Sequence, residues 1–146
     1  MKIRLLQTLA AFAISLAAPA LAEEQNTVDP EVRQEIEAAL TNFDEAYNKN
    51  DATAVAALFT LDAVEAWGWE KSLSTVSGRQ AIERRYALHL RIPGKFSSNL
   101  VQACAIGDEI CAISEFYHVY LKRKGYSVRI YVREGDTWKI RMEYAN

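Results

Sequence analysis

The sequence has 146 residues, with 17 Lys and Arg, 19 Asp and Glu, and a formal net charge of −2 at pH 7. Half of its residues are hydrophobic, which is enough to build the core of one domain. The mild acidity and the lack of a Lys/Arg run argue against nucleic acid or anionic lipid as the main partner.

The N-terminus has the form of a secretory signal peptide. Lys2 and Arg4 precede an apolar run over residues 5–18, and residues 20–22, Ala-Leu-Ala, match a signal-peptidase site. The run is shorter than the ~20 apolar residues of a spanning helix, so we expect export to the periplasm or beyond the cell without a stable membrane anchor. Cleavage after Ala22 leaves 124 residues with a net charge of −4. The predicted organisation is a signal peptide (1–22), a flexible leader (23–29) and a single domain (30–146).

Two helices are predicted at the start of the domain. Asp29-Pro30 supplies an N-cap followed by proline at the first helical position. Apolar residues then recur every three or four positions to about Lys49, as on one face of a helix. Asn50-Asp51 breaks this helix and caps a short, alanine-rich second helix over residues 52–59.

A strand, a loop and a third helix are expected next. Residues 61–69 contain valine and tryptophan at positions typical of a strand, and residues 70–76 are predicted as loop. Ser77-Gly78-Arg79-Gln80 has the S-x-x-Q form of a capping box, which predicts a helix over residues 78–90. Pro93-Gly94 ends it.

The pattern is strand-like from there to the C-terminus. Short, turn-forming separators divide it into four strands, over residues 96–106, 110–121, 126–133 and 137–144. Such spacing predicts an antiparallel meander. Three helices followed by this sheet predict an α+β fold with the helices on one face.

The two cysteines should meet across the first hairpin. A two-residue turn at Gly107-Asp108 places Cys104 directly opposite Cys111, within reach of a disulfide. In an exported protein we expect this bond, with two free buried thiols as the alternative. A metal site built from the two Cys and two His is disfavoured because further ligands lack a recognisable spacing, so we predict none.

The next hairpin decides which polar side chains face one another. A loop at residues 122–125 would place His118 opposite Arg129 and Phe116 opposite Tyr131.

Two rules disagree about the last hairpin. A three-residue loop gathers the apolar residues of both strands on one face, as patterning favours: Val128, Ile130, Val132, Trp138, Ile140 and Met142. A two-residue loop at Gly135-Asp136 is the one that turn chemistry favours. It groups the residues Trp138, Ile140 and Met142 on one face with Arg129, Tyr131 and Arg133. The residue pattern alone leaves both registers open.

Three segments, YNKNDATAVAALFTLDAV, SGRQAIERRY and VREGDTWKIRMEY, resemble the nuclear transport factor 2-like superfamily, and more narrowly its SnoaL-like, ketosteroid-isomerase-like group. The similarity runs from Glu31 to Tyr144. It implies a cone-like fold in which three N-terminal helices pack on a curved, mainly antiparallel sheet. The superfamily includes isomerases, cyclases, dehydratases, binding proteins and assembly domains, so the resemblance is specific for the fold and not for an activity.

The resemblance also implies a ligand pocket on the concave face of the sheet and the two-residue register. The outer face, with Val128, Ile130 and Val132, would then form a homodimer. The implied ligand-binding residues are Tyr47, Trp67, Tyr86, Phe116, Tyr120, Met142 and Tyr144. Core packing is the alternative role for these aromatic side chains.

Steroid isomerase chemistry is not implied. That chemistry needs a carboxylate base and Tyr and Asp donors beside the substrate. In this chain the resemblance puts the base position on Trp67, the tyrosine position on Phe43 and the aspartic donor position near Arg129.

His118 beside Arg129 is the leading candidate for a catalytic site, with Tyr131 as a further donor. A buried arginine binds a carboxylate, phosphate or enolate, and histidine moves a proton near neutral pH. The alternative is an arginine satisfied internally by Asp62 or Glu115.

We therefore expect an exported protein that binds a small, partly apolar molecule in a conical pocket, without a cofactor. The catalytic alternative is a cofactor-free isomerase, cyclase or dehydratase that uses His118 and Arg129. A non-catalytic dimerisation or interaction domain is the third possibility.

Overall fold

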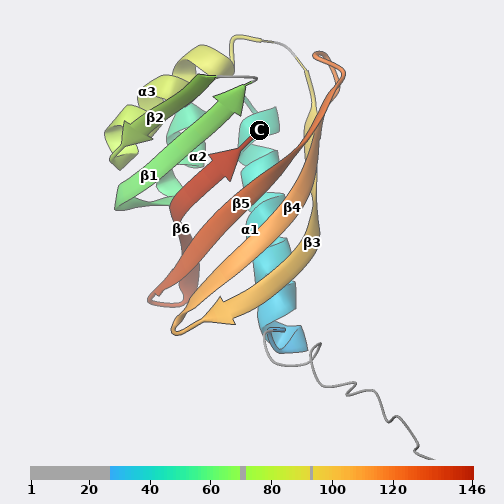
Figure 1. Ribbon diagram of the computed structural model, residues 1–146. Helices are drawn as coiled ribbons and strands as arrows, with labels where there is room; N and C mark the ends of the chain where they lie inside the picture. The colour runs from blue at the N-terminus through green and yellow to red at the C-terminus, as the bar shows by residue number, and fades with distance from the viewer. Residues whose placement is uncertain (1–26, 70–71, 93) are drawn as a thin grey trace, which may run out of the picture.

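The computed structural model describes residues 27–69, 72–92 and 94–146, so the predicted signal peptide and most of the leader lie outside the described residues (Figure 1). Three helices, α1 (Pro30–Asn48), α2 (Ala52–Ala57) and α3 (Arg79–His89), accompany one six-stranded sheet of order β2-β1-β6-β5-β4-β3. The strands are β1 (Phe59–Trp69), β2 (Ser72–Ser77), β3 (Phe96–Ile106), β4 (Glu109–His118), β5 (Arg123–Glu134) and β6 (Thr137–Ala145).

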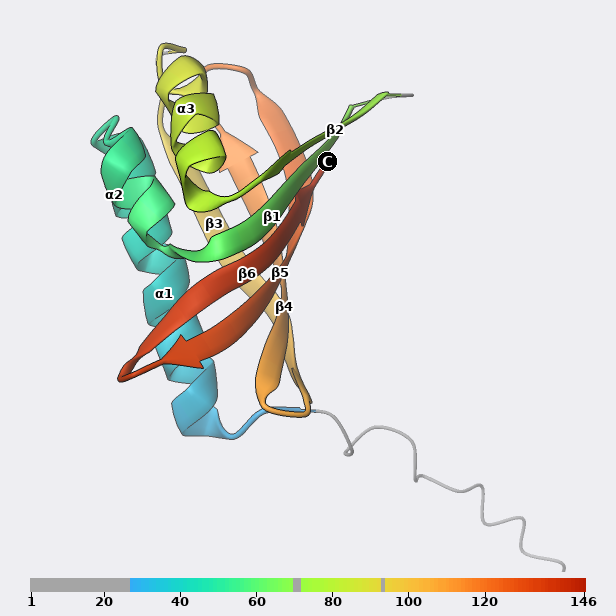
Figure 2. The same ribbon diagram turned by 90° about the vertical axis from the view of Figure 1, so that its left-hand side faces the viewer.

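The three helices lie on one side of the curved sheet, as predicted (Figure 2). Only β1 and β6 pair in parallel, and all other neighbouring strands are antiparallel. The α+β class is therefore confirmed. Among the described residues, no helix has the length and apolar character needed to cross a bilayer.

The long helix α1 is held against the sheet at both its apolar face and its C-terminal end. Ile36, Phe43 and Tyr47 are buried at helical spacing. The amide of Asn48 donates to the carbonyl oxygen of Phe96 at 2.8 Å and accepts from its N–H at 2.7 Å. This reciprocal bond fixes the start of β3 beside the end of α1.

Two local predictions near β2 are wrong. Residues 72–77 form an edge strand and not a loop, because their backbone pairs with β1 while nearly all their side chains stay exposed, which leaves no alternating apolar pattern. Ser77 belongs to this strand and does not cap α3. Gly78 occupies the N-cap position instead, with a φ of 86° and no side-chain cap bond.

The predicted register between β4 and β5 is also wrong. The turn lies at residues 119–122, ahead of the expected loop, and His118 pairs with Arg123. His118 and Arg129 are both buried, but they are not opposite each other.

Gly125 explains why the β4–β5 register differs from the predicted one. It lies within β5 opposite Phe116, where Tyr131 was expected, and not in a turn. A Cβ atom at this position would come within 2.6 Å of Cζ of Phe116 and 2.1 Å of the carbonyl oxygen of Asn146. The glycine therefore permits a close approach inside the sheet.

The β5–β6 hairpin follows both of the registers considered above, each over about half of its length. Next to Gly135-Asp136 the pairing is that of a two-residue turn, with Tyr131 opposite Ile140. A register shift of one residue at Arg141 then places Ile130 opposite Met142, as the apolar pattern favours.

This bulge changes which side chains of β6 face the helices. Met142 and Tyr144, expected on the concave face, are 46% and 37% exposed on the outer face. Glu143 is buried on the concave side in their place. An apolar outer face does exist, and homodimerisation through it stays a prediction.

The register of Cys104 opposite Cys111 is confirmed. Both residues are free thiols, and the thiol of Cys104 donates to the carbonyl oxygen of Cys111 at 3.7 Å. The expected disulfide is therefore not part of this structure.

We predict that Gly125→Ala lowers the free energy of unfolding by about 2–3 kcal/mol, because the new methyl group must displace Phe116 or the C-terminal backbone. Gly107→Ala is the control, since its Cβ meets nothing within 4 Å and its φ of 61° alone costs about 1 kcal/mol. Urea unfolding monitored by circular dichroism measures both. Equal losses for the two variants would contradict the assigned role of Gly125.

Candidate functional site

Two adjoining hollows lead from the surface into the core between the helices and the sheet. The outer one, here called the vestibule, has a volume of about 80 Å³ and is lined by Tyr47, Trp67, His89, Ile92, Phe96, Phe116, His118, Leu121 and Arg123. The inner one, here called the chamber, has a volume of about 10 Å³, shares four aromatic residues with the vestibule, and ends on Tyr86, Arg129 and Glu143. Its volume suits about one water molecule.

Aromatic rings form the walls of the vestibule. Tyr47 packs on Phe96 with ring centroids 4.7 Å apart, and Phe96 stacks on Phe116 at 5.5 Å. On the other side, the ring of Trp67 lies 5.2 Å from that of His89. These contacts come from α1, α3 and three strands, so the walls are set by the packing of helices on the sheet.

His118 presents the only buried imidazole nitrogen without a hydrogen-bond partner among the described residues. The side chain is 4% exposed. Its Nδ1 accepts from the backbone N–H of Leu121 at 3.3 Å, so we assign the proton to Nε2. Burial lowers the pKa of His118 from its ordinary value, a backbone hydrogen bond opposes this, and the charge of Arg123 lowers the pKa further. In the assigned tautomer His118 presents a hydrogen-bond donor to the vestibule, and its role as a base stays a prediction.

Arg129 is neutralised inside the fold. Its Nε and Nη2 atoms donate to one carboxylate oxygen of Glu143 at 2.8 and 2.7 Å, and its guanidinium lies 3.9 Å from the ring centroid of Phe43. Burial opposes the charge and is the largest single effect, but Glu143, Tyr131 and Tyr86 together outweigh it and raise the pKa of Arg129. The predicted anion site at Arg129 is therefore wrong, and the internal partner is neither Asp62 nor Glu115.

Two buried carboxyl groups lie at the inner end of the site, Glu143 on the lining of the chamber and Glu65 near it, and neither was predicted. Tyr86 donates its hydroxyl to Glu143 at 3.3 Å, and the indole N–H of Trp67 donates to Glu65. Nε of Arg85 lies 3.8 Å from the second oxygen of Glu65. Burial and the charge of Glu143 raise the pKa of Glu65 to about 7, against smaller opposing effects of Trp67 and Arg85.

The structure brings together most of the expected ligand-binding residues. Tyr47, Trp67, Phe116 and His118 line the vestibule, and Tyr86 lines the chamber. Tyr131 is fully buried but lines neither hollow. The placement of three others is wrong, since Tyr120 is 61% exposed and Met142 and Tyr144 lie on the outer face.

One of the missed carboxyls had a signal in the sequence. Glu65 stands two positions before Trp67 in the same strand, so strand alternation puts both on one face. Glu143 had no such signal in the sequence, because the bulge at Arg141 reverses the face of the sheet on which Glu143 lies.

Comparison with known proteins gives the fold of the chain and not its activity. No protein-family model matches the sequence, and no curated protein matches it. A protein of unknown function with a cystatin-like fold from Nostoc punctiforme is 12% identical, with a TM-score of 0.70 over 82% of this chain and 78% of that one.

Two further solved structures carry functional descriptions. A candidate dehydratase of the NTF2-like (nuclear transport factor 2-like) family from Streptomyces avermitilis is 20% identical, with a TM-score of 0.63 over 80% of this chain and 96% of that one. A candidate aromatic ring hydroxylase from Novosphingobium aromaticivorans is 17% identical, with a TM-score of 0.66 over 82% and 91%. Likeness at these identities extends to the fold alone.

The raised pKa of Glu65 predicts a pH-dependent loss of stability. Below the ordinary value of 4.5 the carboxyl is protonated in both the folded and the unfolded chain and carries no penalty. Between pH 4.5 and about 7 the unfolded chain ionises this carboxyl while the folded chain keeps it protonated, so the folded state loses up to about 3 kcal/mol, and the loss is complete above about 7. Relative to Glu65→Gln, the native chain should therefore lose stability between about pH 4.5 and pH 7.

Urea unfolding at a series of pH values measures this difference. Glu134→Gln is the control, because Glu134 is exposed and its variant should follow the native pH profile. Parallel profiles for the native chain and Glu65→Gln would show that Glu65 titrates normally.

Proposed function

Because the chain has the nuclear transport factor 2-like fold, we propose that it binds small molecules, and that its vestibule receives the oxygen-bearing end of a compact aromatic or unsaturated compound. The observation that carries this proposal is the buried Nε2 of His118, which has no hydrogen-bond partner in the part of the chain that is described and which bears the proton in the tautomer assigned above. A buried donor left without a partner costs about 1–3 kcal/mol, and a ligand oxygen or a water molecule removes that cost.

The size of the vestibule limits the ligand. Its volume of about 80 Å³ is well below the ≈ 300–1,000 Å³ of sites for drug-sized ligands. An engineered apolar cavity of 150 Å³ holds benzene, so a single ring enters this vestibule only in part. Leu121 and Ile92 on the lining are exposed, which leaves room at the mouth for the rest of the molecule. A steroid or other polycyclic compound does not fit inside.

We predict that acetophenone binds the vestibule more tightly than ethylbenzene, because its carbonyl oxygen accepts from Nε2 of His118. His118→Phe keeps a ring but removes the donor. It should weaken acetophenone binding about fivefold, the equivalent of one hydrogen bond of about 1 kcal/mol, and change ethylbenzene binding less than about twofold. NMR titration that follows the indole signal of Trp67 measures both affinities.

Tyr120→Phe is the matched control, since Tyr120 is an exposed aromatic residue close to His118 in the chain. It should leave both affinities unchanged. Ligand-induced shifts confined to residues outside the two hollows would contradict the proposal.

Proton-transfer catalysis is a second candidate function. It is favoured by the carboxyl pair at the inner end of the chamber, because a group with a pKa of about 7 both takes and gives protons at neutral pH. In such a reaction the proton α to a carbonyl passes to this pair through the one water that the chamber admits, since Glu65 lines neither hollow, and the Nε2–H of His118 stabilises the enolate oxygen. The candidate dehydratase among the fold neighbours is in keeping with chemistry of this class.

Exchange of the methyl protons of acetophenone for deuterium in D₂O tests this second candidate. A catalytic chain should speed the exchange above the buffer rate, and Glu65→Gln should abolish the increase while Glu134→Gln retains it. If acetophenone binds but its methyl protons exchange only at the buffer rate, the catalytic role is rejected and the binding function remains.

A further inference from the structure

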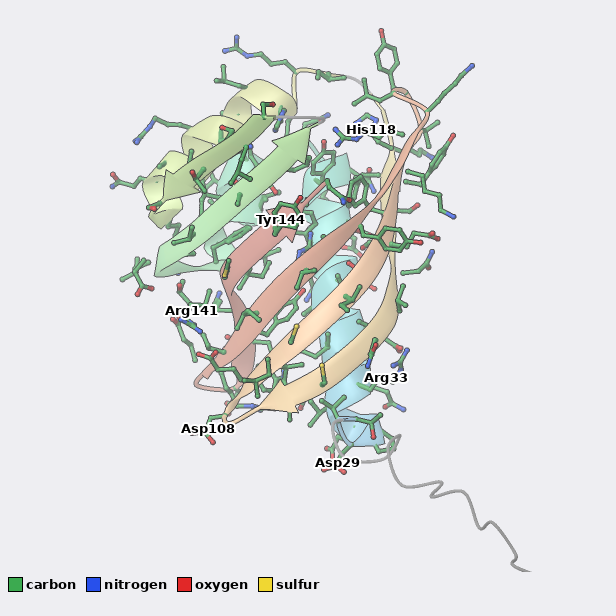
Figure 3. All side chains as sticks on the ribbon, in the orientation of Figure 1. Asp29, Arg33, Asp108, His118, Arg141 and Tyr144 are labelled. Atoms are coloured by element: carbon green, nitrogen blue, oxygen red, sulfur yellow. The ribbon has the colours of Figure 1, made fainter. Side chains whose placement is uncertain are left out.

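The sheet has two edge strands, and α1 covers only one of them. Along β3, side chains of α1 bond to the backbone of the strand at three points, through the pairs Asp44–Ser98, Asn48–Phe96 and Arg33–Leu100. Figure 3 shows Arg33 at this edge. Thr27 pairs with Cys104 farther along the same strand. The backbone of β3 is therefore already met by other parts of this chain.

The edge at β2 has no such cover in the part of the chain that is described. The N–H of Gly78 donates to the carbonyl oxygen of Ala63 at 2.8 Å, and bonded residues alternate along an antiparallel pair. Leu73 and Thr75 therefore turn their backbone groups away from β1, and these groups have no hydrogen-bond partner among the described residues. The strand also lacks the charged residues and prolines that commonly protect an exposed edge. An extended backbone can pair with β2 there.

An open groove runs along the inner side of this edge, between β2 and α3 (Figure 1). It has a volume of about 500 Å³, with Ser74 and Val76 on one wall and Ala81, Arg84 and Leu88 on the other. Alternate side chains of a strand share a face, so a strand added beside β2 directs every second side chain into this groove. The groove therefore lies where a seventh strand needs room.

Arg84 gives the groove a positive charge that is not neutralised within the described chain. Its side chain is exposed and makes no ion pair or hydrogen bond with the described residues. No described Asp or Glu lines the groove. The neighbouring Glu83 accepts from Thr53 of α2, and Arg85 is already paired with Glu65 at 3.8 Å. Arg84 is thus the cation that remains for the carboxylate of a partner.

The spacing of Arg84 and Leu88 fits one face of a strand. Leu88 is 62% exposed and follows Arg84 by one turn on the groove side of α3. Side chains four residues apart on a helix have Cβ atoms about 5–6 Å apart. Side chains two residues apart on a strand are about 6–7 Å apart. A single strand face can therefore place an acidic side chain at Arg84 and an apolar one at Leu88.

We propose that β2 and α3 form a docking site for an extended acidic segment of another protein, which joins the sheet as a seventh strand beside β2. The segment carries Asp or Glu at one position and an apolar residue two positions away. Main-chain hydrogen bonds to β2 supply affinity, and contacts with Arg84 and Leu88 supply selectivity. A second copy of this chain fits less well, because the β2 sequence Ser-Leu-Ser-Thr-Val-Ser offers no acidic side chain.

Two synthetic peptides test the proposal. Ac-Thr-Thr-Glu-Thr-Val-Thr-amide places Glu and Val on one strand face, whereas Ac-Thr-Thr-Thr-Glu-Val-Thr-amide places them on opposite faces. NMR titration of the native chain should show the first peptide binding at least about fivefold more tightly. It should shift the amide signals of Leu73 and Thr75 together with those of α3.

Arg84→Gln should weaken binding of the first peptide about fivefold, because the peptide carboxylate loses its charged donor. Arg84→Glu should reverse the preference, so that the same peptide with Lys in place of Glu binds more tightly. Arg141→Gln is the control, because Arg141 is an exposed arginine that pairs with Glu109 away from α3 (Figure 3). It should leave the affinity unchanged.

Every other outcome contradicts the docking site. No binding, equal affinities for the two peptides, or equal losses in Arg84→Gln and Arg141→Gln would overturn it. Shifts of Leu73 and Thr75 that depend on protein concentration without peptide would assign the edge to a second copy and overturn it as well. Acetophenone binding should be unchanged in Arg84→Gln, so the proposed function of the vestibule is tested separately.

Discussion

The buried ion pair between Arg129 and Glu143 is the interaction on which the interior depends. It joins β5 to β6 at the centre of the concave face, and α1 and α3 reach it through the ring of Phe43 and the hydroxyl of Tyr86. Two charges removed from water are tolerated only where they pair, so α1, α3 and the sheet must meet in one arrangement. The pair is thus a structural element, and it occupies the place where the sequence had suggested an anion site.

With the centre of the concave face filled in this way, the space for a ligand lies towards one end of the sheet. There the aromatic side chains of α1, α3 and the neighbouring strands leave a hollow of about 80 Å³, and His118 turns an unsatisfied N–H towards it. The same exclusion of water that requires the two charges to pair also raises the pKa of Glu65. One packing arrangement therefore produces both the hollow at this end of the sheet and a group that holds a proton near neutral pH.

Local signals in the sequence gave the helices and the aromatic walls, because caps and helical spacing do not depend on distant contacts. Asp51 caps α2 as expected, with the N–H of Ala54 donating to its carboxylate at 2.9 Å. Strand registers were less predictable. Gly125 has the composition of a turn residue but lies in a strand, where it permits a close contact. No residue near Arg141 predicts the bulge that places Glu143, in place of Met142, on the concave face. The polar partners of Arg129 and His118 could not be assigned without those two facts.

The protonation of His118 connects the fold to the proposed binding function, and nitrogen-15 NMR of the imidazole ring reports it directly. A neutral ring at pH 7 with its proton on Nε2 is the predicted state, and the Nε2 signal should move when acetophenone is added. A neutral ring with its proton on Nδ1 would remove the donor from the vestibule and contradict the account of this protein as one that binds a ligand through His118.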